Sequence, residues 1–171
     1  MSWDKPIKLH ELGRGPIRLT LEPDEAARAA IARQLRLKSL PSFTAQVTVK
    51  PWLDGAEITG RFKAVVEQVC GVSLDPFEQA VEGDIEVRAV PAGSEHAAEP
   101  EGGELALDLD APDPPDVLES DVIDVAGYAV EHLALELDPF PRKPGVTFDY
   151  QPPEEETSPF AALKKLTEPK P

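Results

Sequence analysis

The fold is decided by residues 42–70, SFTAQVTVKPWLDGAEITGRFKAVVEQVC, and by the run FEQAVEGDIEVRAV at 77–90. Apolar and polar residues alternate in these stretches, and this period of two is typical of a strand with one buried face. Asp54 and Gly55 separate the first two runs and predict a hairpin turn. Three such runs in succession predict an antiparallel sheet.

A helix is predicted on each side of these strands. The stretch EPDEAARAAIARQLRL at 22–37 follows a short predicted strand at 15–21 and repeats apolar residues every four positions. The stretch SDVIDVAGYAVEHLALEL at 120–137 carries an apolar stripe at helical spacing. Gly127 lies inside it, where glycine costs about 1 kcal/mol against alanine, so we expect a close approach to a strand there. The predicted fold class is α+β: an antiparallel sheet that can curl into a barrel-like form, packed by an N-terminal and a C-terminal helix.

Residues 91–115, PAGSEHAAEPEGGELALDLDAPDPP, break this pattern because they are rich in Pro, Gly, Ala and acids. Such a composition buries too little apolar surface to offset its ordering entropy, which predicts a disordered, mobile acidic loop. Within it, ELALDLD can add a short edge strand. We expect residues 1–150 to form a single domain around this loop. Residues 151–171 are expected to form a disordered polar tail that carries the motif SPFAALKKL.

The length of 171 residues favours one domain with a core of its own. No stretch approaches the roughly 18 to 20 apolar residues that span a bilayer. The first residues, MSWDKPIKLHEL, contain no apolar segment of the kind found in secretory signals. A single cysteine excludes an internal disulfide. We therefore expect a cytoplasmic protein that does not contact membranes.

The charge is strongly negative and unevenly distributed. The whole chain carries a net charge of −15, yet residues 1–50 hold nine bases and five acids. Between Ala89 and Pro141 there are 14 acids and no Lys or Arg. Such a surface repels phosphate backbones, so any contact with nucleic acid would have to come from the N-terminal third.

The bases of the first predicted helix gather on one side of it. Arg28, Arg33 and Arg36, with Lys38 nearby, form either an ordinary solvated helix face or a contact for RNA phosphates or an acidic partner. The acidic loop also has two interpretations. It either solvates the domain or offers a negative arm to a basic protein.

Cys70, in the stretch EQVCGVSL, is the only cysteine. Ser73 stands where the second thiol of a C-x-x-C pair would be. A structural zinc ion takes four ligands of Cys, His or carboxylate, and His10, His96 and His132 are far apart in the sequence. The pattern favours a small buried thiol without a metal.

Motifs for catalysis are absent from the sequence. There is no G-x-S-x-G, and the glycines fit neither the phosphate-loop nor the dinucleotide-binding spacing. Acids are so numerous that no pair stands out as general acid and base. We predict no enzymatic activity, no cofactor and no small-molecule substrate.

The order of the elements resembles the YceD family, the large ribosomal RNA subunit accumulation proteins of bacteria and plastids. Three pieces carry the resemblance: residues 58–90 with the cysteine between two strands, the acid-flanked helix DVIDVAGYAVEHLALELDPFP at 121–141, and SPFAALKKL at 158–166. The family motif C-x-x-C-L is Cys70-Gly-Val-Ser73-Leu here. Many members carry another cysteine in the region 144–150, which this chain lacks. If the family cysteines bind zinc, this chain has lost the metal and keeps one thiol for packing.

The resemblance implies a non-enzymatic ribosome-biogenesis factor that supports accumulation of large-subunit rRNA. Its partner would be a ribosomal protein, a pre-ribosomal particle or an rRNA precursor. The alternative is a metal-binding or enzymatic protein whose site is not recognised. In the C-terminal motif, Pro159, Phe160 and Leu163 match the family signature, and the segment either packs on its own sheet or docks in a partner's groove.

Overall fold

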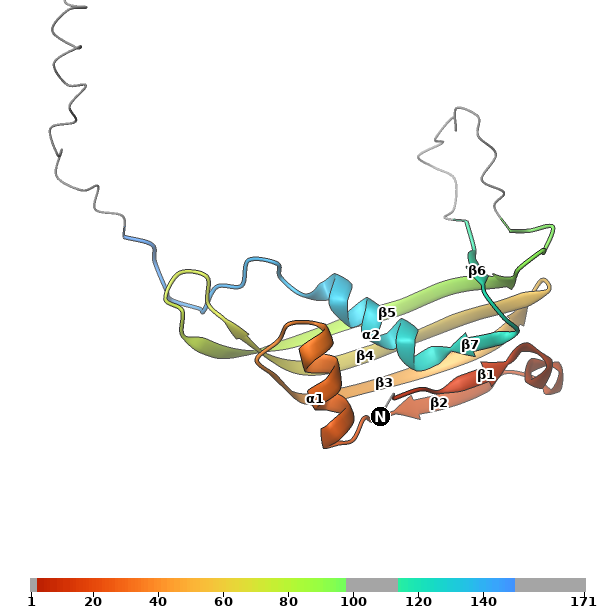
Figure 1. Ribbon diagram of the computed structural model, residues 1–171, viewed down its shortest axis with the longest axis horizontal. Coiled ribbons are helices and arrows are strands. Elements are labelled where there is room, and N and C mark those ends of the chain that lie inside the picture. The colour runs from red at the N-terminus through yellow and green to blue at the C-terminus, as the bar shows by residue number, and fades with distance from the viewer. Residues whose placement is uncertain (1–2, 98–113, 150–171) are drawn as a thin grey trace, which may run out of the picture.

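The computed structural model of the chain describes residues 3–97 and 114–149 (Figure 1). Most of the expected acidic loop, the ELALDLD segment and the C-terminal motif lie outside the described residues. The described elements are β1 (Pro6–Lys8), η1 (Leu9–Arg14), β2 (Ile17–Leu21), α1 (Glu25–Gln34), β3 (Ser39–Trp52), β4 (Gly55–Val69), β5 (Pro76–Pro91), β6 (Asp116–Leu118), β7 (Val122–Asp124) and α2 (Val125–Glu136).

The main sheet has five strands in the order β2-β3-β4-β5-β6. Its first four strands are antiparallel neighbours, and β6 joins β5 in parallel. A separate antiparallel pair, β1 with β7, lies beside the start of α2 (Figure 1). The predicted α+β class and the three long central strands are therefore confirmed.

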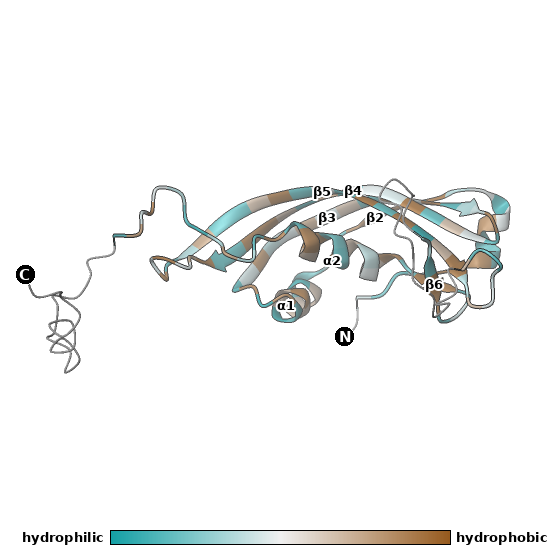
Figure 2. Ribbon diagram, turned by 90° about the horizontal axis from the view of Figure 1, so that it is seen from above, coloured by the Kyte–Doolittle hydropathy of each residue, from teal (hydrophilic) through white to brown (hydrophobic). Residues whose placement is uncertain are grey.

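The sheet is open, so the expectation of a barrel-like form is wrong. In the described part of the chain its edges are the short strands β2 and β6, which do not pair with each other. Both helices lie on one side of the curved sheet (Figure 2). Their buried side chains, among them Ile31 and Leu133, fill the space that a closed barrel would need for its own interior.

Both predicted helices form, and each is shorter than its apolar pattern. Helix α1 begins after Asp24, whose carboxylate accepts a hydrogen bond from the Ala27 N–H at 2.8 Å. Helix α2 begins only at Val125, because Val122–Asp124 pairs with β1 as a strand instead. This pairing also anchors the N-terminal segment, and Ile7 is buried there.

The turn between β3 and β4 differs from the predicted one by one residue. Trp52 pairs with Gly55, so Leu53 and Asp54 form the loop, and Leu53 adopts a positive φ of 51°. Gly55 belongs to β4 rather than to the turn. A Cβ atom there would collide with the carbonyl oxygen of Ala89, so glycine is needed for the close approach of β5.

Phe62 lies at the centre of the core between the sheet and α2. Its ring packs edge-on against Phe43 with 6.1 Å between centroids, and Phe43 contacts Trp3 in the same way at 5.8 Å. A Cβ atom at Gly83 would lie 2.8 Å from the Phe62 ring, so Gly83 provides the space for that ring.

Gly127 is exposed, and its neighbour is the carboxylate of Asp124 directly before the same helix.

Within residues 3–97 and 114–149, every helix falls short of the length and apolar character that crossing a membrane requires.

Replacing Phe62 with alanine should lower the free energy of unfolding by about 3 to 5 kcal/mol, because it leaves a cavity in a closely packed core. The side chain is 1% exposed. Urea denaturation followed by far-UV circular dichroism measures the change.

Phe140→Ala is the matched control, since the same atoms are removed from a side chain that is 79% exposed. It should change stability by less than about 0.5 kcal/mol. Equal losses in the two variants would contradict the placement of Phe62 in the core.

Candidate functional site

The connection between β4 and β5 is a closed turn that starts at Cys70. The Cys70 N–H donates to the carbonyl of Asp75, and the Leu74 N–H donates to the carbonyl of Cys70, both at 2.9 Å. Leu74 adopts a positive φ of 62°. The ends of the turn are thus tied together, and Cys70 is buried beneath it.

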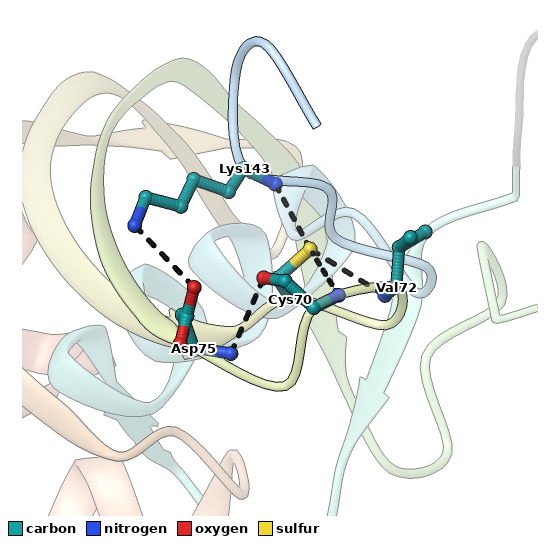
Figure 3. A network of polar contacts seen from close by, with 5 residues as sticks. Cys70, Val72, Asp75 and Lys143 are labelled. Atoms are coloured by element: carbon teal, nitrogen blue, oxygen red, sulfur yellow. Dashed lines mark hydrogen bonds and ion pairs between the residues drawn. The ribbon is translucent and has the colours of Figure 1, made fainter. Parts of the chain in front are cut away.

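The Cys70 sulfur joins this turn to the segment after α2. Its Sγ accepts hydrogen bonds from the backbone N–H groups of Val72, Ser73 and Lys143, each at 3.4 Å (Figure 3). The Lys143 ammonium also pairs with Asp75 at 3.7 Å. The thiol therefore connects two parts of the chain that are 73 residues apart.

These donors stabilise the thiolate form of Cys70. The Ser73 hydroxyl, followed by the N–H groups of Ser73 and Lys143, lowers the pKa of the thiol to about 6, although burial opposes this effect. A thiolate is also the form in which cysteine binds metals. Here the Ser73 hydroxyl stands at the sequence position of the second thiol and donates to the sulfur. No group of three or more His, Cys, Asp or Glu that could hold a metal ion occurs within residues 3–97 and 114–149.

The structure brings three of the four predicted basic residues to one end of the molecule. Arg33 is in the last turn of α1, and Arg36 and Lys38 follow it, all with exposed positions. Arg28 differs, because its guanidinium donates to the Pro23 carbonyl at 3.0 Å and so is directed to the start of the helix. Lys38 lies 3.9 Å from Glu67. Of these four bases, Arg33 and Arg36 are therefore the most available to a partner.

Arg36 occupies a backbone conformation that normally favours glycine. Its φ is 57°, and it is the residue after the C-cap Leu35. The Leu37 N–H donates to Ala32 at 2.9 Å and the Arg36 N–H donates to Arg33 at 3.3 Å, the paired bonds of a Schellman motif. A bulky residue in this left-handed conformation costs about 1 kcal/mol or more. Arginine at this position therefore lowers local stability relative to glycine.

A groove opens beside these bases, between the C-terminal ends of α1 and α2. Its volume is about 670 Å³. Polar groups come from Arg36, Lys38, Gln68 and Asp138. The rest of the lining is apolar: Leu35, Leu37, Val69, Ala134, Leu137, Pro139 and Pro141. The groove thus combines apolar surface with a basic margin.

A second groove, of about 480 Å³, lies between β5 and α2 and is acidic. Glu86, Asp116 and Glu131 line it together with Tyr128. Burial, followed by the negative charge of Asp116, raises the pKa of the Tyr128 phenol above its ordinary value. The phenol therefore stays protonated in this negative environment and can donate a hydrogen bond.

Glu57 is a buried acid that the sequence pattern did not reveal. It is 8% exposed and pairs with Lys50 and, at 3.3 Å, with Arg88. The hydrogen bond from Lys50 is the main reason that its pKa is lowered. The Arg88 guanidinium also lies over the Trp52 ring, 5.3 Å from its centroid. These contacts join β3, β4 and β5 at the hairpin end.

Pro159, Phe160 and Leu163 lie outside the described residues, so their docking role stays a prediction.

Comparison with known proteins identifies one family. The model of the YceD family, described as large ribosomal RNA subunit accumulation protein YceD, matches residues 58–167, which is more than half of the chain. No curated protein and no solved structure matches. The matched region contains the Cys70 turn, β5 and α2.

The Cys70 thiol should titrate near pH 6 in the folded protein, as followed by thiolate absorbance in the ultraviolet. Ser73→Ala should raise this pKa, because it removes the hydroxyl that lowers it most. The folded pKa is below the unfolded value, so the stabilisation is complete above about pH 9 and is lost as the pH falls through 6. The free energy of unfolding of the wild-type protein, relative to that of Cys70→Ala, should therefore increase as the pH rises from about 6 to about 9. A pH-independent difference would contradict a stabilised thiolate.

Arg36→Gly should raise the free energy of unfolding by about 1 kcal/mol, because glycine adopts a positive φ without steric cost. Urea denaturation measures the gain. Arg36→Ala is the control, since it removes the same charge and keeps a Cβ atom in the left-handed conformation. Equal stabilities of the two variants would show that the backbone is not strained there.

Proposed function

The chain belongs to the YceD family, and on this premise we propose that it is a binding factor without chemistry of its own that supports accumulation of large-subunit rRNA. Its direct partner in this proposal is a basic ribosomal protein or an assembly particle that contains one. The observation that carries the proposal is the acidic surface along β5 and α2, within the region that the family model matches.

Electrostatics favours a basic protein as the main partner. A net charge of −15 on 171 residues attracts cationic proteins and repels bare RNA. Ribosomal proteins are strongly basic, and an acidic factor can shield such a protein as nucleic acid would. Such charge complementarity increases the association rate, and the resulting binding weakens as salt is added.

The basic end offers a second, smaller contact. Arg33 and Arg36 are exposed beside the apolar groove, and the αL conformation of Arg36 is maintained at a cost to local stability. Residues held in a strained backbone conformation cluster at functional sites. We propose that these two arginines contact rRNA phosphates of an assembly intermediate whose basic protein is held by the acidic surface.

The test is affinity purification of the tagged full chain from cells that make it, at low and at high salt, with identification of bound proteins and RNA. Large-subunit proteins or precursor rRNA should be enriched at low salt and depleted at high salt. In cells depleted of the protein, the ratio of large-subunit to small-subunit rRNA should fall. An unchanged ratio, or a lack of enrichment at low salt, would contradict the proposal.

A double variant, Arg33→Gln with Arg36→Gln, should reduce the bound rRNA without lowering the melting temperature. The matched control is Arg14→Gln with Arg18→Gln, which removes two exposed arginines elsewhere. Equal rRNA yields from the two variants would exclude the basic end. Metal analysis of the purified protein covers the other class of function, since a stoichiometric metal ion would support a metalloprotein instead.

A further inference from the structure

Within the described residues, the outer edge of β5 is unpaired over most of its length. β6 pairs with β5 only at Ala89, Val90 and Pro91. Along residues 76–88, no strand lies on the outer side of β5 in the part of the chain that the structure describes (Figure 1). Backbone N–H and C=O groups on this edge are therefore open to pairing with another chain.

The two faces of this edge differ in polarity. Val81 and Ile85 point to the helix side and are buried, whereas the acids lie at even-numbered positions, on the opposite and exposed face. These acids are Glu78, Glu82, Asp84 and Glu86. A strand placed beside β5 would thus meet an acidic face on one side and an apolar face on the other.

The neighbouring strand β4 already shows which charges suit this acidic face. Lys63 pairs with Glu82 at 3.6 Å, and Arg61 pairs with Asp84 at 2.8 Å. Opposite charges on adjacent strands stabilise a sheet, and like charges destabilise it. If this alternation of charge from β4 to β5 continues outward, a strand added beside β5 carries cations opposite these acids.

Helix α2 forms a wall beside the same edge. Tyr128, Glu131, His132 and Leu135 recur at helical spacing and line the acidic groove with residues 86–88 of β5. The Leu135 side chain is 75% exposed. An apolar side chain from an added strand can pack against it and the β5 residues opposite.

We infer that residues 76–88 of β5 bind an extended, Lys- and Arg-rich segment of a partner protein as an additional strand. The segment carries cations at every second position, facing the acids of β5, and apolar residues between them, facing α2. Backbone hydrogen bonds supply affinity in this mode and alternate side chains supply specificity. The inference rests on the proposed function and specifies which surface holds the basic protein.

Other occupants fit this edge less well. RNA phosphates would meet the acids of β5 and the acidic groove, and would be repelled. A second copy of this chain, paired edge to edge through β5, would put the acids of one strand opposite those of the other. A basic extended segment is the occupant that satisfies both the free backbone and the charge.

The test measures binding of a labelled peptide of about ten residues that alternates Lys and Val, a length that covers most of the free edge. Fluorescence anisotropy with the full chain gives the dissociation constant at low and high salt, and hydrogen exchange of the full chain locates the contact. The alternating peptide should bind, and its affinity should fall with salt. It should slow exchange of those amides in residues 76–88 that do not bond to β4. A peptide of equal composition with all Lys before all Val, and an N-methylated version of the alternating peptide, should bind at least about tenfold more weakly, because each loses the strand pairing.

Glu78→Lys with Glu86→Lys should weaken binding by roughly tenfold or more at low salt. Neither glutamate forms an ion pair with another described residue, and both are exposed, so the fold should be retained. The matched control is Glu11→Lys with Glu22→Lys, which changes the net charge equally at exposed positions away from β5. It should bind nearly as the wild type does.

Several results would overturn the inference: equal binding of the block or N-methylated peptide, equal loss in the two charge variants, or strong protection, before peptide is added, of those amides in residues 76–88 that do not bond to β4. Concentration-dependent dimerisation that the Glu78 and Glu86 variant enhances would assign the edge to a second copy. Binding of an RNA oligonucleotide at this edge would also contradict the inference. Enrichment of large-subunit components from cells without peptide binding would refute this inference alone, whereas peptide binding without that enrichment would refute the proposed function.

Discussion

The structure depends on one constraint: only one face of the central sheet is apolar. Along β3, β4 and β5, which are 14, 15 and 16 residues long, buried and exposed side chains alternate over most of the paired length. Both helices must therefore pack on the same side, since that is where apolar surface can be removed from water. The opposite face and the long edge of β5 are left to polar residues. The surfaces available for binding follow directly from this one-sided core.

The long elements could be predicted from the sequence, and the short ones could not. Alternation over β3 to β5 and helical spacing in α1 and α2 are strong signals because they repeat several times. Three-residue strands such as β1 and β7 contain no full repeat, and their pairing joins segments more than 110 positions apart. The barrel expectation failed for a similar reason. Closure depends on whether the edge strands meet, which alternation within a strand does not encode.

The site shows the same division between local and distant information. The sequence singled out Cys70, Ser73 and the arginines as candidate residues. It gave no sign of the Lys143 N–H, which donates to the Cys70 sulfur at 3.4 Å. It grouped Arg28 with Arg33, whereas the structure directs the Arg28 guanidinium to Pro23. The strained backbone of Arg36 was also hidden, because arginine gives no signal for a positive φ. Only spatial neighbours reveal which charges are engaged and which are available.

The Cys70 turn has a consequence for the C-terminal end of the domain. By bonding Lys143, and through the Gly71 N–H that donates to the Pro141 carbonyl at 2.9 Å, it holds the segment after α2 against the β4–β5 turn. That segment lines the apolar groove next to Arg36 and Lys38. The last described residue, Asp149, is eleven positions before Phe160, a stretch that spans at most about 40 Å when extended. A buried thiol can thus determine where the chain leaves the domain, and hence which surfaces the motif at 158–166 is able to reach.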